Sequence, residues 1–301
     1  MTGRWGRLVG PTRISTCIVR ATRLLPRHED EARALLMQDP EVNLFLLDLL
    51  AQGGLPLAGA RHLWMGATDE TGALVSIVYA ATPHPARAAS TAVAWGDPEG
   101  CTLLGRWLAM RRGTRMIVGP RGPSDALWSG LGTPPPQTRY DQRLYVCDAP
   151  PDGDALPVER AREGDLDTLS RMHAAMLQED LGIDPADLDI DTHRGQALFR
   201  IRKGRSWVSR DRRGHIQFTI GVGTEGPLGA QVGGTFVPPA LRGAGISTRA
   251  MRGLCRALLA EVPRVTLHVN EANLGAVKCY ERSGFRRAAP FRLMVLGSRF
   301  G

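Results

Sequence analysis

The sequence predicts an α+β protein of two domains, and three observations support this. The chain has 301 residues, more than one average domain uses. Proline and glycine gather at residues 148–156, where they break regular structure and mark a linker. The second half shows the order β-α-α-β-β-β-α-β-α-β, whose consecutive strands exclude a repeated βαβ layout. We therefore assign an N-terminal extension at 1–17, a smaller α/β domain at 18–150 and an α+β domain at 151–301.

Local patterns place the elements of the first half. Apolar residues at helical spacing over residues 29–50 predict a helix, which Asp39-Pro40 divides into two. Residues 119–125 contain glycines but also prolines and no helical stripe, so no helix is expected there. The remaining expected elements are strands at 73–80, 91–95, 116–118 and 143–147 and a helix at 105–111. None of these segments carries a catalytic motif.

The second half has clearer signals. Asp165 can cap a helix whose apolar residues follow at helical spacing, and the turn Asp211–Gly214 joins two strands into a hairpin. A glycine at position 284 ends the last helix. In order, we expect strand 155–161, a helix from 166, helix 192–202, strands 206–210, 215–222 and 229–237, a helix through 262, strand 264–269, helix 273–282 and strand 291–296.

Charge and composition exclude several classes of protein. The net charge is +8, from 38 basic and 30 acidic residues. The excess is spread evenly over both halves, whereas a nucleic-acid-binding protein gathers it on one face. No apolar run reaches the ~18 residues that span a bilayer, and no secretory leader is recognisable. The five cysteines lie far apart, without metal-ligand spacing. We expect a cytoplasmic protein without metal, membrane or nucleic-acid partner.

The most informative segment is TFVPPALRGAGIST, residues 235–248. A strand ends at Val237, two prolines form a rigid exit, and Gly243 and Gly245 open a helix. Small residues let consecutive backbone N–H groups point into one concavity at the positive end of the helix dipole, which suits a pyrophosphate. A plain strand–turn–helix connection explains the same glycines, so this segment alone leaves both readings open. The P-loop and dinucleotide-binding patterns do not fit.

A second segment, residues 267–285, carries a strand followed by Asn273, Ala276, Tyr280, Gly284 and Phe285. With both segments, the chain resembles the GNAT superfamily of acyl-CoA-dependent N-acyltransferases over about residues 155–301. The family's turn is (Arg/Gln)-x-x-Gly-x-(Gly/Ala), and its second motif is Asn-x-x-Ala-x-x-x-Tyr. The turn here departs only in its last small residue, Ser247. The resemblance implies the GNAT fold, a mostly antiparallel sheet flanked by helices.

The resemblance also implies roles for individual residues. The backbone of three strand residues would pair with the pantetheine arm, the turn would hold the pyrophosphate, and Asn273 would bond the same cofactor. Tyr280 would protonate the departing thiolate, unless it is an aromatic that only packs the last helix. The residues implied to bind the cofactor, acetyl-CoA, are Thr235, Phe236, Val237, Arg242, Gly243, Ala244, Gly245, Ile246, Ser247, Thr248 and Asn273.

The general base is less determined. His268 stands where some family members carry a catalytic Glu, and an imidazole with an ordinary pKa near 6.5 suits the task. A histidine that only packs in its strand fits equally well. Glu179 and Asp180 follow the first helix of this half, where acceptor loops lie in the family. They could bind a cationic amine or act as base, or simply form a solvated helix end.

The whole chain also resembles bacterial two-domain proteins in which an uncharacterised domain precedes a GNAT domain, through DPEVNLF (39–45) and EDLGIDP (179–185). The resemblance leads us to expect that the first domain is a degenerate GNAT-like unit without the cofactor turn. The predicted function is transfer of an acetyl group to the primary amine of an unidentified acceptor, by direct attack in a ternary complex. Two alternatives are a CoA-binding sensor without turnover and an enzyme that uses a longer acyl-CoA.

Overall fold

The structure is a computed structural model that describes residues 18–56, 62–81, 90–111, 113–181, 184, 186 and 189–296. The expected extension at 1–17 and part of the segment 179–185 lie outside these residues. Both halves have the same order of elements, β-α-α-β-β-β-α-β-α-β. The chain is therefore a tandem repeat, and the first half is a GNAT-like unit, as the sequence suggested.

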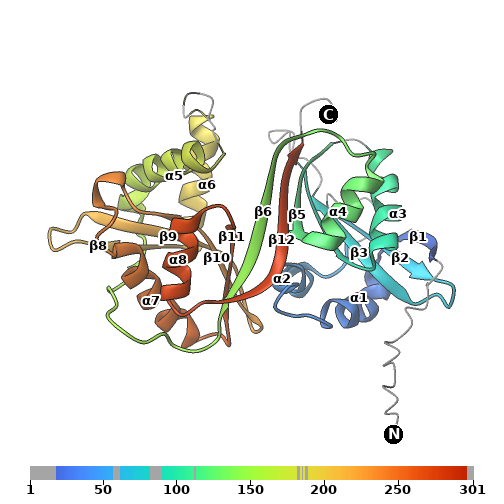
Figure 1. Cartoon of the computed structure of the whole chain (residues 1–301), viewed down its shortest axis with the longest axis horizontal. Helices are drawn as coiled ribbons and strands as arrows, with labels where there is room; N and C mark the ends of the chain where they lie inside the picture. The colour runs from blue at the N-terminus through green and yellow to red at the C-terminus, as the bar shows by residue number, and fades with distance from the viewer. Residues whose placement is uncertain are drawn as a thin grey trace, which may run out of the picture.

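The first repeat surrounds its strands with four helices. Its elements are β1 (Ile18–Arg23), α1 (Glu29–Leu36), α2 (Leu44–Gly53), β2 (His62–Asp69), β3 (Leu74–Ala81), β4 (Ser90–Gly96), α3 (Pro98–Ala109), β5 (Thr114–Pro120), α4 (Arg121–Gly130) and β6 (Pro136–Cys147). In Figure 1 α3 and α4 cover one face of these strands, and α1 and α2 lie on the other side.

The second repeat has the same plan. Its elements are β7 (Glu159–Arg160), α5 (Leu166–Leu181), α6 (Ile190–Arg202), β8 (Ser206–Arg210), β9 (Ile216–Gly226), β10 (Gly229–Phe236), α7 (Ile246–Leu259), β11 (Val265–Asn270), α8 (Leu274–Arg282) and β12 (Arg286–Leu296). Short 3₁₀ turns at Glu163–Asp165 and Pro239–Leu241 precede α5 and α7.

All described strands form one 12-stranded sheet in the order β1-β2-β3-β4-β5-β12-β6-β11-β10-β9-β8-β7. Within each repeat the first four strands pair antiparallel, and the fourth and fifth pair parallel: β4 with β5, and β10 with β11. The pairing pattern therefore repeats along with the element order, which confirms the mixed, mostly antiparallel sheet expected for the second half.

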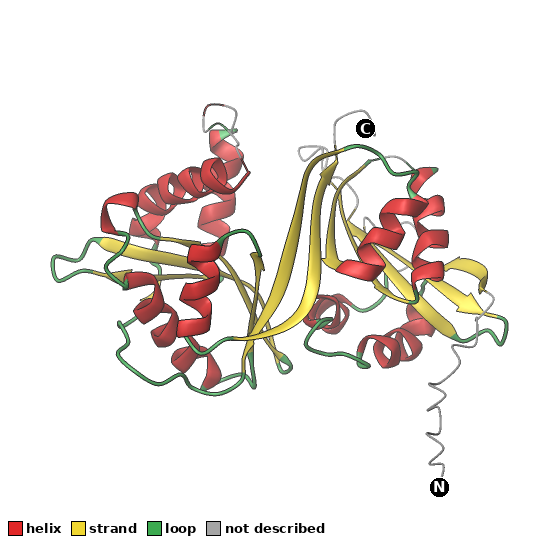
Figure 2. Cartoon of the chain, in the orientation of Figure 1, coloured by secondary structure: helices red, strands yellow, loops and turns green. Residues whose placement is uncertain are grey.

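The last strands of the two repeats are exchanged. β6 ends the first repeat but pairs with β11 of the second, and β12 ends the second repeat but pairs with β5 of the first. The two exchanged strands also pair antiparallel with each other, and they run side by side between the two halves in Figures 1 and 2. Each repeat therefore completes its sheet with a strand from the other.

Ion pairs reinforce this junction. Arg292 of β12 is 5% exposed and donates two hydrogen bonds of 2.8 Å to the carboxylate of Asp125 on α4. It also pairs with Asp141 of the neighbouring β6. Because a buried charge without partners is costly, removing both carboxylates would make Arg292 strongly destabilising.

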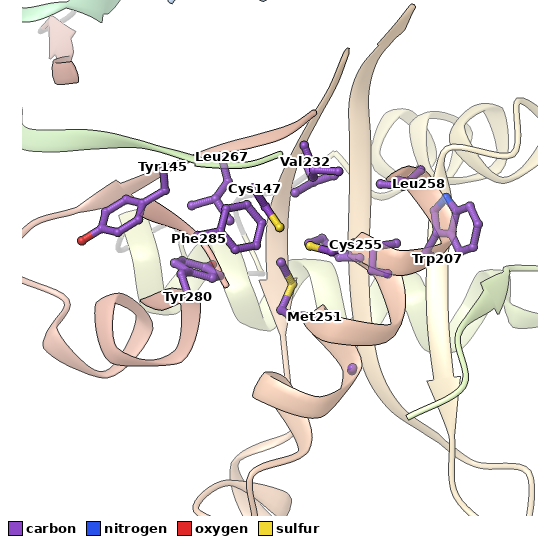
Figure 3. Close-up of a cluster of buried hydrophobic side chains, with 14 of the residues drawn as sticks. Tyr145, Cys147, Trp207, Val232, Met251, Cys255, Leu258, Leu267, Tyr280 and Phe285 are labelled. Atoms are coloured by element: carbon purple, nitrogen blue, oxygen red, sulfur yellow. The ribbon is translucent and has the colours of Figure 1, made fainter. Parts of the chain in front are cut away.

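Two residues of the first repeat belong to the hydrophobic core of the second repeat. α7 buries Met251, Cys255 and Leu258 against the sheet, and fully buried Tyr145 and Cys147 of β6 belong to the same apolar cluster. Figure 3 shows Cys147 beside Met251 and Cys255. The core beneath α7 is thus incomplete without β6.

Several sequence expectations differ from the structure. A helix, α4, begins at Arg121, although none was expected there; Pro123 lies in its first turn, where the missing N–H has no helical partner to lose. β1 and β2 were not predicted. The expected strand 155–161 is only the short β7, and β6 extends the expected 143–147 back to Pro136.

The exchange predicts how fragments behave. A fragment of residues 134–301 keeps β6, and we expect it to melt cooperatively and bind CoA. A fragment of residues 152–301 loses the partner of β11 and two fully buried side chains, so we expect no cooperative melting transition. Thermal unfolding followed by circular dichroism measures both. A cooperative transition and full CoA affinity in the shorter fragment would contradict the structural role of β6.

Candidate active site

A cleft of about 720 Å³ opens in the second repeat where β10 and β11 separate. The two strands pair parallel only from Ala230 opposite Val265 to Val232 opposite Leu267. After this point the register of β10 against β9 shifts between Gly233 and Phe236. Since β10 bends away from β11 at a bulge, the sheet itself leaves a wedge-shaped opening there.

The structure brings most of the predicted site residues to this one cleft. Those that line it are Thr235, Phe236, Val237, Arg242, Gly243, Ser247, His268, Asn273 and Tyr280. The other four, Ala244, Gly245, Ile246 and Thr248, lie in the same turn or in the first turn of α7 without lining the cleft. The two sequence motifs, about thirty residues apart in the chain, therefore meet at one opening.

The glycine turn has the backbone that the sequence predicts. Gly243 and Gly245 have φ angles of 82° and 70°, which L side chains rarely adopt. Gly245 is the N-cap of α7 and offers no side chain to cap it. The first N–H groups of a 14-residue helix thus have no side-chain cap, and Gly243 and Ser247 of this turn line the cleft, so the turn fits an anionic group such as a pyrophosphate.

Arg242 has a partner that the sequence did not predict. Its Nε donates to the carbonyl of Val237 at 2.9 Å, and its Nη2 pairs with Glu179 of α5 at 2.8 Å. The guanidinium also lies 5.4 Å from the centre of the Phe236 ring. The Arg242–Glu179 pair is exposed and contributes little stability, so an anion can compete for Arg242.

Tyr280 of α8 lies at the wall of the cleft. Its ring is buried, and its hydroxyl donates a hydrogen bond to Oγ1 of Thr235 on β10 at 3.2 Å. Burial raises the pKa of Tyr280 to about 12, so the hydroxyl keeps its proton at neutral pH. The side chain is therefore both packed and available as a proton donor.

His268 of β11 also lines the cleft. Its ring stacks on Phe291 of β12 with centroids 4.2 Å apart, and its Nε2 is buried without a hydrogen-bond partner. Burial lowers the pKa of His268 to about 4. The imidazole is thus neutral at pH 7 and a weaker proton acceptor than its ordinary pKa suggested.

Asp180 lines the cleft from the end of α5. Burial raises the pKa of its carboxyl group, and the neighbouring Glu179 raises it further. The hydroxyl of Tyr140 on β6 donates to the backbone carbonyl of Asp180 at 3.0 Å. A carboxylate with a raised pKa is a better base than an ordinary one, which makes Asp180 a second candidate proton acceptor beside His268.

The exchanged strands supply cleft residues that sequence patterns could not place. Tyr140 and Gln142 come from β6, and Leu293 comes from β12. Glu271, just before Asn273, receives 3.1 and 2.8 Å hydrogen bonds from Arg121 and Arg143 of the first repeat. The first repeat thus forms one wall of the cleft and fixes the start of the helix that carries Tyr280.

Asn273 is the N-cap of α8, and its side-chain oxygen accepts a hydrogen bond from the N–H of Ala276 at 3.0 Å. This bond satisfies one of the free donors at the start of the helix. The spacing from Asn273 to Ala276 in the motif therefore has a structural cause in addition to any contact with a cofactor.

The matching position of the first repeat is closed to anions. There α3 follows β4 through Asp97 and Pro98, with no glycine turn between them. The Asp97 carboxylate accepts hydrogen bonds from the N–H groups of Glu99 and Gly100, at 2.8 and 3.3 Å. A carboxylate occupies these donors and repels a phosphate, so this helix start does not suit a pyrophosphate.

Comparison with known proteins shows which family and folds this chain is similar to. Residues 174–285 match the acetyltransferase (GNAT) family. A GNAT-family acetyltransferase from Colwellia psychrerythraea aligns with a TM-score of 0.55 and 11% identity, over 93% of this chain and 100% of that one. A GCN5-related N-acetyltransferase from Sphaerobacter thermophilus aligns with a TM-score of 0.62 and 16% identity, over 91% and 94%. No curated protein sequence matches significantly.

A tandem GNAT protein from the clavulanic acid biosynthesis pathway shares the two-repeat fold, with a TM-score of 0.52 and 16% identity over 92% of this chain and 98% of that one. Residues 174–285 thus form a GNAT domain, and the family indicates acyl-CoA N-acyltransferase activity in general. Within the described residues, no helix is long and apolar enough to cross a membrane, and no cluster of three or more His, Cys, Asp or Glu could hold a metal ion.

The contrast between the two repeats predicts the binding stoichiometry. We expect one CoA per chain, because the Asp97 carboxylate caps α3, the helix of the first repeat that matches α7. Isothermal titration calorimetry measures this number directly. Two sites of similar affinity would contradict the inference from Asp97.

The Arg242–Glu179 pair predicts an effect on affinity. Glu179→Gln frees Arg242 and removes a negative charge near the turn, so CoA should bind tighter by about two- to fivefold. The control is Glu163→Gln, because Glu163 forms a similarly exposed pair with Arg202 and does not line the cleft. Weaker CoA binding by Glu179→Gln, as measured by calorimetry, would show that the pair holds the turn in its binding conformation.

Proposed function

We propose that the protein is an acyl-CoA N-acyltransferase that moves an acyl group, acetyl in the simplest case, to the primary amine of an acceptor. The observation that carries this proposal is the meeting of an uncapped helix start, a bent strand and a buried tyrosine hydroxyl at one cleft. The helix start suits a pyrophosphate, and the bent strand offers backbone groups to the extended pantetheine arm. The tyrosine hydroxyl offers a proton.

The cleft gives each group a role. After β10 leaves β11, the backbone of Thr235, Phe236 and Val237 is no longer paired with β11, and it can pair with the pantetheine arm as an added strand would. Tyr280 protonates the sulfur when the thioester breaks, because its hydroxyl keeps its proton at neutral pH. The amine attacks the thioester directly, so both substrates occupy the cleft together.

The attacking amine must first lose a proton. We assign this role to Asp180, because desolvation raises the pKa of its carboxyl group and makes it a better base than an ordinary carboxylate, whereas burial lowers the pKa of His268 to about 4 and makes it a poorer base than an ordinary imidazole. His268 has a buried ring nitrogen without a partner, which can form a hydrogen bond to the amine without taking its proton. Asp180 and Glu179 together also give the cleft negative charge that attracts a cationic acceptor.

The role of Tyr280 has a direct test. Tyr280→Phe keeps the ring and its packing but removes the proton, so CoA affinity should hold within a few-fold while kcat falls by roughly 10²–10⁴. Release of the CoA thiol with a panel of amines measures kcat. An unchanged kcat would show that Tyr280 only packs, and no thiol release from wild type with any amine would favour a CoA sensor.

The choice between the two bases rests on the pH profile. If Asp180 is the base, Asp180→Asn lowers kcat/KM and removes the fall in rate at acidic pH, because that fall reports protonation of the carboxylate. His268→Gln keeps a hydrogen-bonding group, and because His268 is already neutral above about pH 4, the profile from pH 5 to 9 should not change. A changed profile in His268→Gln with an unchanged one in Asp180→Asn would reverse the assignment. Wild type and variants are compared on the same amine.

A further inference from the structure

A second cavity, of about 350 Å³, lies between the sheet of the second repeat and the helices α5 and α6. Its floor is β9 and β10, and it shares Met176, Gly233, Gly234 and Phe236 with the cleft. The two cavities therefore meet at the bulge of β10. We call the second cavity the side channel.

Glycines make the floor of the side channel. Side chains alternate along β9, so Ile220 and Val222 point into the core beneath α7, while Gly221 and Gly223 lie on the opposite face. Gly221 is directly opposite Gly233 of β10. Because glycine has no side chain, this face of the sheet leaves space where α5 and α6 would otherwise pack.

The roof of the side channel is one face of each helix. Leu169, His173 and Met176 follow one another at i, i+4 and i+7 along α5, and Ala197 and Arg200 lie at i, i+3 on α6. Met176 marks the end that joins the cleft, since its sulfur lies 3.5 Å from where a Cβ on Gly234 would stand. His173 follows one helical turn further in.

The end away from the cleft is more polar. The channel runs along β10 from Gly234 to Gln231, about 10 Å at the usual rise of a strand. Arg200 and His173 lie near this end, and His173 is one turn along α5 from Met176. The Nδ1 atom of His173 is buried and has no hydrogen-bond partner among the described residues. Among the residues that the structure describes, none that lines the channel is an Asp or Glu.

Charge separates the two cavities. Asp180 and Glu179 line the cleft, where a cationic amine is attracted, whereas no carboxylate lines the side channel within the described part of the chain. The amine acceptor is therefore favoured in the cleft. The channel suits a chain that is apolar next to the bulge of β10. The far end of such a chain would carry a hydrogen-bond acceptor. Its volume is that of a small-molecule site and exceeds what an acetyl group fills.

We propose that the side channel holds the acyl chain of the donor, and that this donor carries an acyl group longer than acetyl, with a carboxylate or another hydrogen-bond acceptor at its end. This inference rests on the proposed acyl-CoA function and names its donor class. The bulge places the two cavities end to end, so a chain that starts at the thioester in the cleft continues into the channel past Gly233 and Gly234.

The test measures the affinity of CoA and of acetyl-, butyryl-, pentanoyl- and glutaryl-CoA by calorimetry. In wild type each methylene buried in the channel should improve affinity about fourfold over acetyl-CoA. Glutaryl-CoA should bind at least as tightly as pentanoyl-CoA, which has the same chain length without the acid. Equal affinity for all the thioesters would overturn the proposal.

Gly221→Leu fills the channel and should abolish the dependence on chain length while CoA itself binds within about twofold. A Cβ at Gly221 meets only ordinary contacts, the nearest at 3.4 Å, so Gly221→Ala is a milder variant that keeps the fold. Gly195→Leu is the matched control, because Gly195 lies on α6 with open space around it.

The possible outcomes distinguish a failure of the proposed acyl-CoA function from a failure of the channel assignment. If neither CoA nor any thioester binds wild type, the proposed function fails. If CoA binds but chain length has no effect, only the channel assignment fails. If Gly221→Leu keeps the chain-length series and instead raises KM for the amine, the channel holds the acceptor and the proposal is overturned.

Discussion

The parallel pairing of β10 and β11 ends after three residue pairs, and the site depends on this early separation. If the strands continued side by side, their backbone groups would satisfy one another and no cleft would form. Because they separate, the end of β10 keeps free hydrogen-bonding groups, the helix start of α7 opens toward them, and Tyr280 reaches Thr235 across the gap. One interruption in the sheet thus opens the cleft and leaves the hydroxyl of Tyr280 at its wall.

The exchange of β6 and β12 makes the two repeats one structural unit around that cleft. β6 completes the sheet next to β11 and contributes Tyr145 and Cys147 to the core beneath α7. It also brings Tyr140 to the end of α5, where its hydroxyl holds the backbone of Asp180. In the first repeat the Asp97 carboxylate occupies the matching helix N–H groups, so what this repeat adds to the chain is its structural contribution to the second repeat.

The sequence predicted the parts of the fold and site that depend on local chemistry. The glycine turn needs residues that adopt positive φ, and Asn273 needs Ala276 three residues later for its cap, so both leave a pattern in the chain. The exchanged strands leave no such pattern. Residues 136–143 of β6 alternate between exposed and half-buried positions, and their partners lie more than a hundred residues away. The pKa of His268 likewise depends on its burial in the folded chain, which no local spacing reveals.

The central claim is that the turn between β10 and α7 binds the pyrophosphate of an acyl-CoA. Titration of the ¹⁵N-labelled protein with CoA, followed by NMR, tests it residue by residue. The account predicts the largest shifts for the backbone amides of Gly243, Gly245 and Ser247, with smaller ones along Thr235–Val237 and none at Glu99 and Gly100 of the first repeat. Shifts confined to other surfaces, or none at saturating CoA, would contradict it.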